Sequence, residues 1–143
     1  MNSKVKRFVF GVALLALLLP ATQAQTFSSG RSYECSVKEV AALKEDGSIG
    51  PTRWTELISQ RFERFTFDEA TGAFRWNGDD KVWLYEVHQA GTEDLSLLAS
   101  RRYQGTAAFV LSRLEIETYQ EGATEYPFFL ISSEIYSGTC GVF

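Results

Sequence analysis

The sequence predicts an all-β domain, a small antiparallel meander of seven or eight strands that closes into an up-and-down barrel. Short segments rich in aromatic and β-branched residues recur between turn signals at intervals of about ten to fifteen residues. Several of these segments alternate apolar and polar residues, as strands with one buried face do. The two cysteines, Cys35 and Cys140, lie near opposite ends of the chain, where the first and last strands of such a barrel meet. A two-layer β-sandwich is the alternative, because it has the same spacing of turns.

Residues 1–24 have the features of a cleavable signal peptide, and residues 25–143 form the predicted single domain. A basic head at residues 4–7 precedes an apolar run at residues 8–19. That run is too short for a transmembrane helix, which needs roughly 20 apolar residues. Residues 21–24 supply the small side chains that signal peptidase accepts. We therefore expect an exported protein, periplasmic or extracellular, with no stable membrane insertion after cleavage.

The cysteine count predicts a disulfide. An exported chain reaches an oxidising compartment, and two cysteines allow one intramolecular pairing, Cys35 with Cys140. A metal site built on these cysteines would need further Cys or His ligands at short spacing. The chain contains one histidine, so we expect a structural disulfide, no bound metal and no cofactor.

The first half of the domain is predicted to contain three strands and a short helical segment. Tyr33, Cys35 and Val37 alternate with polar residues in the first strand. Trp54, Leu57 and Ile58 have the i, i+3, i+4 spacing of a single helical turn. The predicted elements are the strand 31–40, the turn 44–48, the helical turn within 51–58, the strand 62–68, the turn 69–72 and the strand 73–76.

The Asn77-Gly78 pair is the strongest hairpin signal in the chain. Both residue types tolerate the positive φ of a type I′ turn, so the next strand should return directly after it. That strand is expected at residues 81–90. One of its faces carries Trp83, Tyr85 and Val87, and the other carries Val82, Leu84, Glu86 and His88.

The last part of the domain continues the meander. The cleanest alternation sets Leu114, Ile116 and Thr118 against polar neighbours, which predicts a strand with one solvated face. The remaining elements are the turn 91–94, the strand 95–104, a break at Gly105-Thr106, the strand around 113–119, the turn 120–122 and the segments 126–131 and 135–140. Whether the last two segments are one strand or two around Ser132-Ser133 is left open.

The charge of the mature domain excludes one class of partner. Three of the 14 basic residues lie in the signal peptide, which leaves 11 against 18 acidic residues and a net charge of −7. Phosphate backbones reward clustered Lys and Arg. We therefore expect no binding of nucleic acid.

One strand carries a candidate acid/base pair. Glu86 and His88 are two residues apart, so their side chains share a face, and a carboxylate there can orient an imidazole. The sequence offers no Gly-x-Ser-x-Gly elbow, and both cysteines are assigned to the disulfide. With no nucleophile beside the pair, we assign no catalytic residue.

A small basic cluster supplies the candidate contacts to a ligand or partner. Arg101, Arg102 and, on the neighbouring strand, Arg113 are the clustered positive charges of an acidic domain, and Tyr103 lies beside them. Guanidinium groups bind carboxylates through paired hydrogen bonds. The sequence thus favours a non-enzymatic binding module for a protein or a small apolar ligand. The alternatives are a hydrolase or isomerase that uses Glu86 and His88, and a structural component of the cell envelope.

Overall fold

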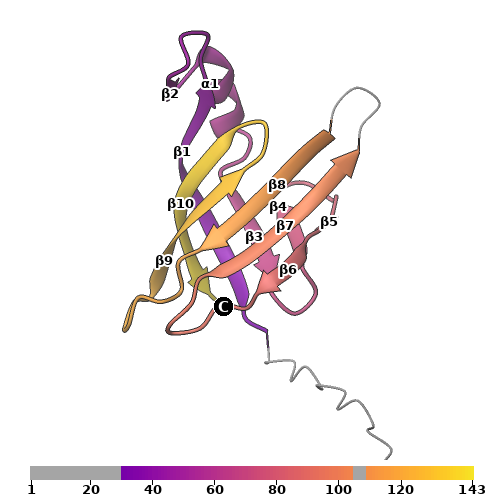
Figure 1. Ribbon diagram of the computed structural model, residues 1–143, viewed down its shortest axis with the longest axis vertical. Helices are drawn as coiled ribbons and strands as arrows, with labels where there is room; N and C mark the ends of the chain where they lie inside the picture. The colour runs from indigo at the N-terminus through magenta and orange to yellow at the C-terminus, as the bar shows by residue number, and fades with distance from the viewer. Residues whose placement is uncertain (1–29, 105–108) are drawn as a thin grey trace, which may run out of the picture.

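The computed structural model describes residues 30–104 and 109–143 (Figure 1). The predicted signal peptide and the predicted break at Gly105-Thr106 lie outside these ranges. The elements are β1 (Ser32–Leu43), β2 (Ile49–Gly50), α1 (Arg53–Ser59), β3 (Arg64–Asp68), β4 (Ala73–Trp76), β5 (Trp83–Leu84), β6 (Glu86–Gln89), β7 (Leu97–Gln104), β8 (Phe109–Ile116), β9 (Glu125–Ile131) and β10 (Ile135–Val142).

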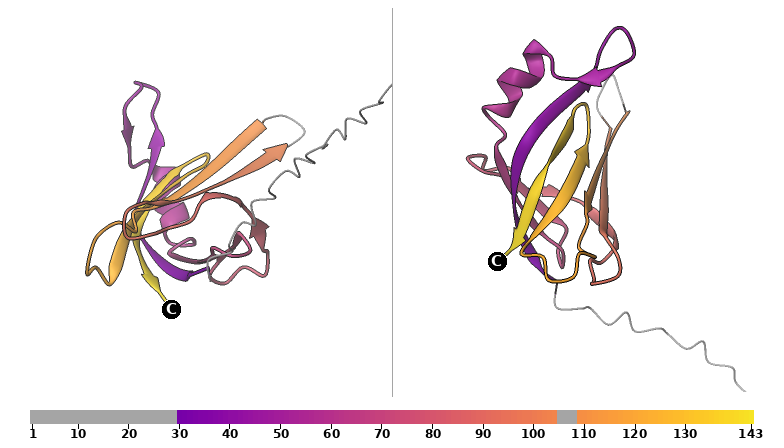
Figure 2. Two further views of the ribbon diagram at one scale, coloured as in Figure 1. Left: turned by 60° about the horizontal axis from the view of Figure 1, so that its bottom comes forward. Right: turned by 90° about the vertical axis from the view of Figure 1, so that its left-hand side faces the viewer.

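The strands form one antiparallel sheet that curls into a nearly closed barrel, as predicted (Figures 1 and 2). Their order is β5-β4-β3-β1-β10-β9-β8-β7-β6, and β2 pairs with β1 outside this path. Each strand from β6 to β10 lies beside its neighbours in the sequence, so the second half is a simple meander. The pairing of β1 with β10 joins the two halves.

The two ends of the sheet are consecutive pieces of the chain. β5 pairs with β4 and β6 pairs with β7, and the one residue between them is Tyr85. The backbone N–H of Tyr85 donates to the carbonyl oxygen of Gly72, in the β3–β4 turn, at 2.8 Å. We call this junction the seam. The chain therefore crosses the seam covalently, and the predicted strand 81–90 is one bent segment that changes its pairing partner at Tyr85.

The predicted disulfide is present. Cys35 and Cys140 lie directly opposite each other in the β1–β10 pair, and their sulfur atoms are bonded at 2.00 Å. Both residues are fully buried. The bond fastens the pair of strands that joins the two halves of the meander.

The barrel interior is the hydrophobic core. The first inward residues of β1 are Tyr33, Cys35 and Val37, and a bulge between Val37 and Glu39 shifts the inward side to Val40. From the seam and the other strands, the core residues are Phe65, Phe67, Phe74, Tyr85, Leu97, Ala99, Leu114, Ile116, Phe128, Leu130, Tyr136 and Cys140. The alternation predicted for Leu114, Ile116 and Thr118 is confirmed by the burial of all three.

The predicted helical turn is a seven-residue helix, α1, which with the β1–β2 hairpin extends beyond one end of the barrel (Figure 2). Thr52 and Thr55 cap it reciprocally, since each hydroxyl accepts a hydrogen bond from the backbone N–H of the other residue. Ile58 packs on the core, while Trp54 and Leu57 are exposed. Among the described residues, no helix has the length and apolar character required to cross a membrane.

The prediction of a type I′ turn at Asn77-Gly78 was wrong. Gly78 has a φ of +80°, but no residue other than glycine has a positive φ in the described part of the chain. The backbone N–H of Asn77 donates instead to the carbonyl of Arg64, so Asn77 continues the contact with β3. The first pair of the next strand is Phe74 with Trp83, and residues 77–82 form a longer loop.

Candidate functional site

A cavity of about 240 Å³ opens at the end of the barrel near α1 and the β9–β10 hairpin. We call it the mouth. Its apolar wall consists of Phe62, Phe74, Trp76, Trp83, Tyr85, Leu130 and Tyr136. Its polar groups come from Asp79, Arg101, Ser112, Ser132, Ser133 and Glu134. The mouth thus combines an aromatic surface with groups of both charges.

The alternation of side chains along β4 places two aromatic residues on the wall of the mouth. Phe74 and Trp76 are two residues apart on β4, so their side chains share the inner face. The ring centroid of Trp76 lies 5.2 Å from that of Phe74, 5.3 Å from that of Tyr136 and 4.9 Å from that of Phe62. Trp76 therefore joins β4, β10 and the segment after α1 into one packed surface.

Arg101 is the cation of the mouth. It comes after Leu97 and Ala99 among the inward-facing residues of β7. Leu97 and Ala99 are buried in the core, whereas Arg101 lies at the opening of the barrel. Its guanidinium carbon lies 4.0 Å from the centroid of the Trp83 ring, and the ammonium of Lys81 lies 3.7 Å from the same ring. The Trp83 ring thus holds Arg101 by a cation–π contact.

Arg101 also lies among hydroxyl groups. Ser112 is directly opposite it on β8, and the Ser112 hydroxyl donates to that of Ser132 at 3.1 Å. Burial raises the pKa of Tyr85, while a hydrogen bond with Ser112 and the positive charge of Arg101 act in the opposite direction. Tyr85 therefore keeps its proton at neutral pH and presents a hydroxyl on the same side of the mouth.

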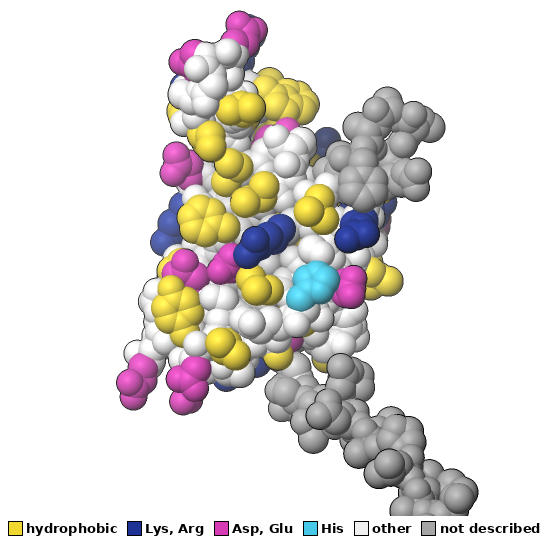
Figure 3. All heavy atoms as spheres, in the orientation of Figure 1, with side chains coloured by type: hydrophobic (Ala, Val, Ile, Leu, Met, Phe, Trp, Pro, Cys, Tyr) yellow, Lys and Arg dark blue, Asp and Glu magenta, His cyan; other side chains and the backbone are white. Residues whose placement is uncertain are grey.

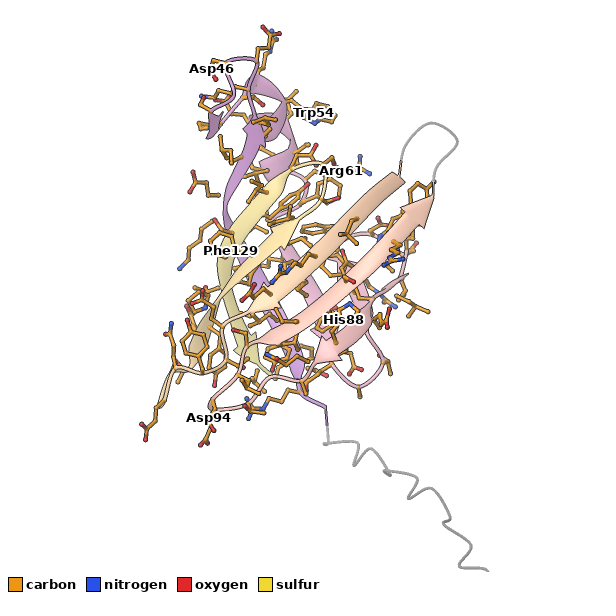
Figure 4. All side chains as sticks on the ribbon, viewed as in Figure 1. Asp46, Trp54, Arg61, His88, Asp94 and Phe129 are labelled. Atoms are coloured by element: carbon orange, nitrogen blue, oxygen red, sulfur yellow. A yellow bond between two sulfur atoms is a disulfide. The ribbon has the colours of Figure 1, made fainter. Side chains whose placement is uncertain are left out.

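Glu134 is an acidic residue of the mouth that is held by hydrogen bonds. Its carboxylate accepts hydrogen bonds from the Trp54 indole at 3.1 Å, the Ser133 hydroxyl at 2.6 Å and the Tyr136 hydroxyl at 3.4 Å. Burial, and then the charge of Glu134, raise the pKa of Tyr136, which keeps its hydroxyl a donor. Trp54 extends from α1 (Figure 4), so this carboxylate connects the helix to the β9–β10 hairpin.

The structure separates the predicted basic cluster. Arg101 and Tyr103 lie on the inner side of β7, and the Arg101 guanidinium is 5.5 Å from the Tyr103 ring centroid. Arg102 lies between them and is exposed on the outer side. Arg113 is also on the outer side, where its guanidinium bonds the Glu115 carboxylate at 3.1 Å.

The candidate acid/base pair lies on the outer surface of the barrel. The single histidine of the chain, His88, is solvent-facing (Figures 3 and 4). Its Nδ1 lies 3.9 Å from the Glu86 carboxylate, and its Nε2 lies 2.6 Å from the Ser100 hydroxyl. The sequence analysis missed Ser100, because the pairing of β6 with β7 brings it opposite Glu86.

Sequence reasoning also missed most of the mouth. The alternation predicted for residues 81–90 puts Trp83 and Tyr85 on one strand face, and this pattern indicates a shared surface. Nothing in the sequence pattern marks Ser112 or Glu134 as neighbours of that face, since their positions depend on the register of β8 and on the β9–β10 turn.

No group of three or more His, Cys, Asp or Glu side chains within residues 30–104 and 109–143 is arranged to hold a metal ion. No family model, no curated protein and no solved structure matches this chain.

Proposed function

We propose that the protein is an exported, non-enzymatic binding module that holds a small, partly apolar ligand, or one side chain of a partner protein, in the mouth of its barrel. The observation that carries the proposal is the aromatic cavity of about 240 Å³ with its few polar groups. Binding sites of this composition occur in the mouths of β-barrels. The disulfide and the predicted signal peptide support export, because disulfides persist in oxidising compartments.

The size of the mouth limits what it can hold. Sites for drug-sized ligands usually enclose about 300–1,000 Å³, and this cavity is smaller. A single ring with a short substituent suits it. The aromatic wall supplies the apolar contact, while Arg101, Ser132 and Glu134 at its border supply orientation.

The proposal is tested by titrating small aromatic and alicyclic fragments into the isotope-labelled domain and following its amide and indole resonances by NMR. Bound fragments should shift the indole signals of Trp76 and Trp83. Ser112→Phe places a ring in the cavity and should abolish these shifts. Ser137→Phe places the same ring on the outer face of β10 and should leave them unchanged.

Two results would contradict the binding proposal. One is a library in which no fragment perturbs the mouth, which would favour a structural component of the envelope instead. The other is unchanged binding in Ser112→Phe once its fold is verified by the dispersion of its spectrum. A ligand that still binds when the cavity is filled by the new ring binds outside the mouth.

A second candidate function is favoured by the row of Glu86, His88 and Ser100. A base within hydrogen-bond reach of a hydroxyl and flanked by a carboxylate is the arrangement of a serine nucleophile. In an ester hydrolysis, the Ser100 oxygen would attack the carbonyl carbon, while His88 takes the hydroxyl proton and passes it to the departing alcohol. Water would then release the acyl group.

This candidate ranks second because the surroundings of Ser100 lack other parts of such a site. β7 lies between β6 and β8, so the strand ladders use the backbone around Ser100. An oxyanion needs unoccupied donors. In addition, the side chain of Glu86 is 81% exposed and that of His88 is 45% exposed, which leaves both groups in water.

A fluorophosphonate probe tests the second candidate directly. An active triad would label Ser100 in the wild-type protein, and His88→Ala would lose the labelling because the hydroxyl proton would have no acceptor. We expect no labelling above that of Ser100→Ala, measured by intact-protein mass spectrometry. Labelling that depends on His88 would reverse the ranking of the two functions.

A further inference from the structure

We infer that the ligand of the mouth carries a carboxylate, which pairs with Arg101. This inference rests on the proposed binding function and specifies its ligand class, a small aromatic or alicyclic carboxylic acid. The observation behind it is a half-buried guanidinium in the mouth that has no acidic partner among the described residues.

Arg101 takes no part in the ion pairs of the described residues. The ion pairs among the described residues join Arg64 to Glu34, His88 to Glu86 and Arg113 to Glu115, and none includes Arg101.

The two acids of the mouth have other contacts. Glu134 accepts three hydrogen bonds from neighbouring side chains, and the Asp79 carboxylate accepts one from the Lys81 backbone at 3.0 Å. Both acids thus have hydrogen-bond donors of their own, whereas Arg101 forms no ion pair with any described carboxylate.

Stacking prepares the guanidinium for this role. The Arg101 guanidinium carbon lies over the Trp83 ring, and a guanidinium stacked on a ring keeps its in-plane N–H donors available for hydrogen bonds. A planar carboxylate matches that edge with two parallel hydrogen bonds. The ring contact also restrains the Arg101 side chain, so less conformational freedom is lost when an anion binds.

The groups beside Arg101 are suited to the same anion. Ser112 donates its hydroxyl proton to Ser132, which leaves the Ser132 proton free to donate. These hydroxyls lie next to the aromatic wall, so a ring carrying a carboxylate could place its apolar part on the wall and its charge at Arg101.

The test uses matched pairs of probes that differ in charge and keep their shape. These are 3-phenylpropanoate with 3-phenylpropanamide, benzoate with benzamide, and cyclohexanecarboxylate with its amide. Dissociation constants are measured by NMR titration. The wild-type protein should bind the carboxylates about tenfold more tightly than the amides, because hydrogen bonds to charged groups contribute more than neutral ones.

Variants assign that preference to one residue. Arg101→Gln should remove the preference for carboxylates and leave the affinity for the amides within about twofold, whereas Arg101→Lys, which keeps the charge and loses the paired geometry, should keep part of it. Arg102→Gln is the matched control, because the neighbouring guanidinium lies on the outer side of β7. It should bind both probe classes as the wild-type protein does.

The possible results separate the inference from the function on which it rests. Equal affinities for carboxylates and amides in the wild-type protein, or a preference that survives in folded Arg101→Gln, would overturn the inference and leave the binding function in place. Failure of every probe and every library fragment to perturb the mouth would overturn both.

Discussion

Replacing both cysteines with alanine should lower the free energy of unfolding by about 4 kcal/mol, since the bond joins residues separated by 105 positions. Closing so long a loop restricts the unfolded chain strongly, by up to about 4.7 kcal/mol in the chain-entropy model. Alanine suits the test because both sites are fully buried, and a serine would bury two hydroxyl groups.

The effect is measured by denaturant unfolding of three proteins. These are the wild-type protein with its Cys35–Cys140 bond, the reduced wild-type protein and the double alanine variant. The reduced protein is the matched control, because it loses the bond and keeps the sulfur atoms in the core. Both forms should unfold at similarly lowered denaturant concentrations. A loss below about 1 kcal/mol in both would mean that the β1–β10 pairing needs no covalent support, contrary to the loop argument.

The parts of the fold that could be predicted are those that depend on the alternation of residues within one strand and on the number of cysteines. Alternation placed Tyr33 and Cys35 on the inner face of β1 and Leu114 and Ile116 on that of β8, and all four are buried. The disulfide followed from export chemistry and from the cysteine count. These inferences need only strand periodicity and the pairing of the first strand with the last.

The parts that could not be predicted depend on competition between non-local contacts. Asn77-Gly78 has the composition of a tight turn, but the backbone N–H of Asn77 donates a hydrogen bond to the carbonyl oxygen of Arg64. The chain therefore reverses direction through the longer loop at residues 77–82. The strand 81–90 shows no break in its alternation at Tyr85, because the seam arises from a change of pairing partner. Such a change leaves the inward and outward pattern intact.

The candidate site also has a part that could be predicted from the sequence and a part that could not. Arg101 could be selected from the sequence as a charge in an acidic domain, but its separation from Arg102 and Arg113 depends on which side of β7 and β8 each side chain occupies. Ser112 and Glu134 reach the mouth through register and a hairpin. The side chains of the mouth come from six strands and the loops between them, and no pattern in one sequence shows that they meet.

Gly72→Ala is expected to destabilise the protein by about 3 kcal/mol or more, since two costs add at this residue. Its φ is +69°, a conformation that costs an L-residue roughly 1–2 kcal/mol. In addition, a Cβ atom there would overlap the carbonyl oxygen of Tyr85. That oxygen belongs to the backbone, so relief requires the seam itself to move.

Gly78→Ala separates the two costs. Gly78 has a similar φ of +80°, but no atom outside Gly78 and its two chain neighbours lies within 4 Å of a Cβ placed there. Its substitution should therefore cost only about 1 kcal/mol, in line with the conformational cost alone. Thermal and denaturant unfolding of both variants gives the difference, and equal losses would show that the seam moves aside freely.

The same comparison connects the seam to the mouth. Gly72 accepts the backbone hydrogen bond of Tyr85, whose side chain lines the cavity together with Trp83 and Arg101. Movement of the seam should shift the mouth resonances and weaken fragment binding in folded Gly72→Ala, whereas Gly78→Ala should bind as the wild-type protein does. Unchanged binding in the destabilised variant would mean that the β5–β6 junction supports the barrel without positioning its mouth.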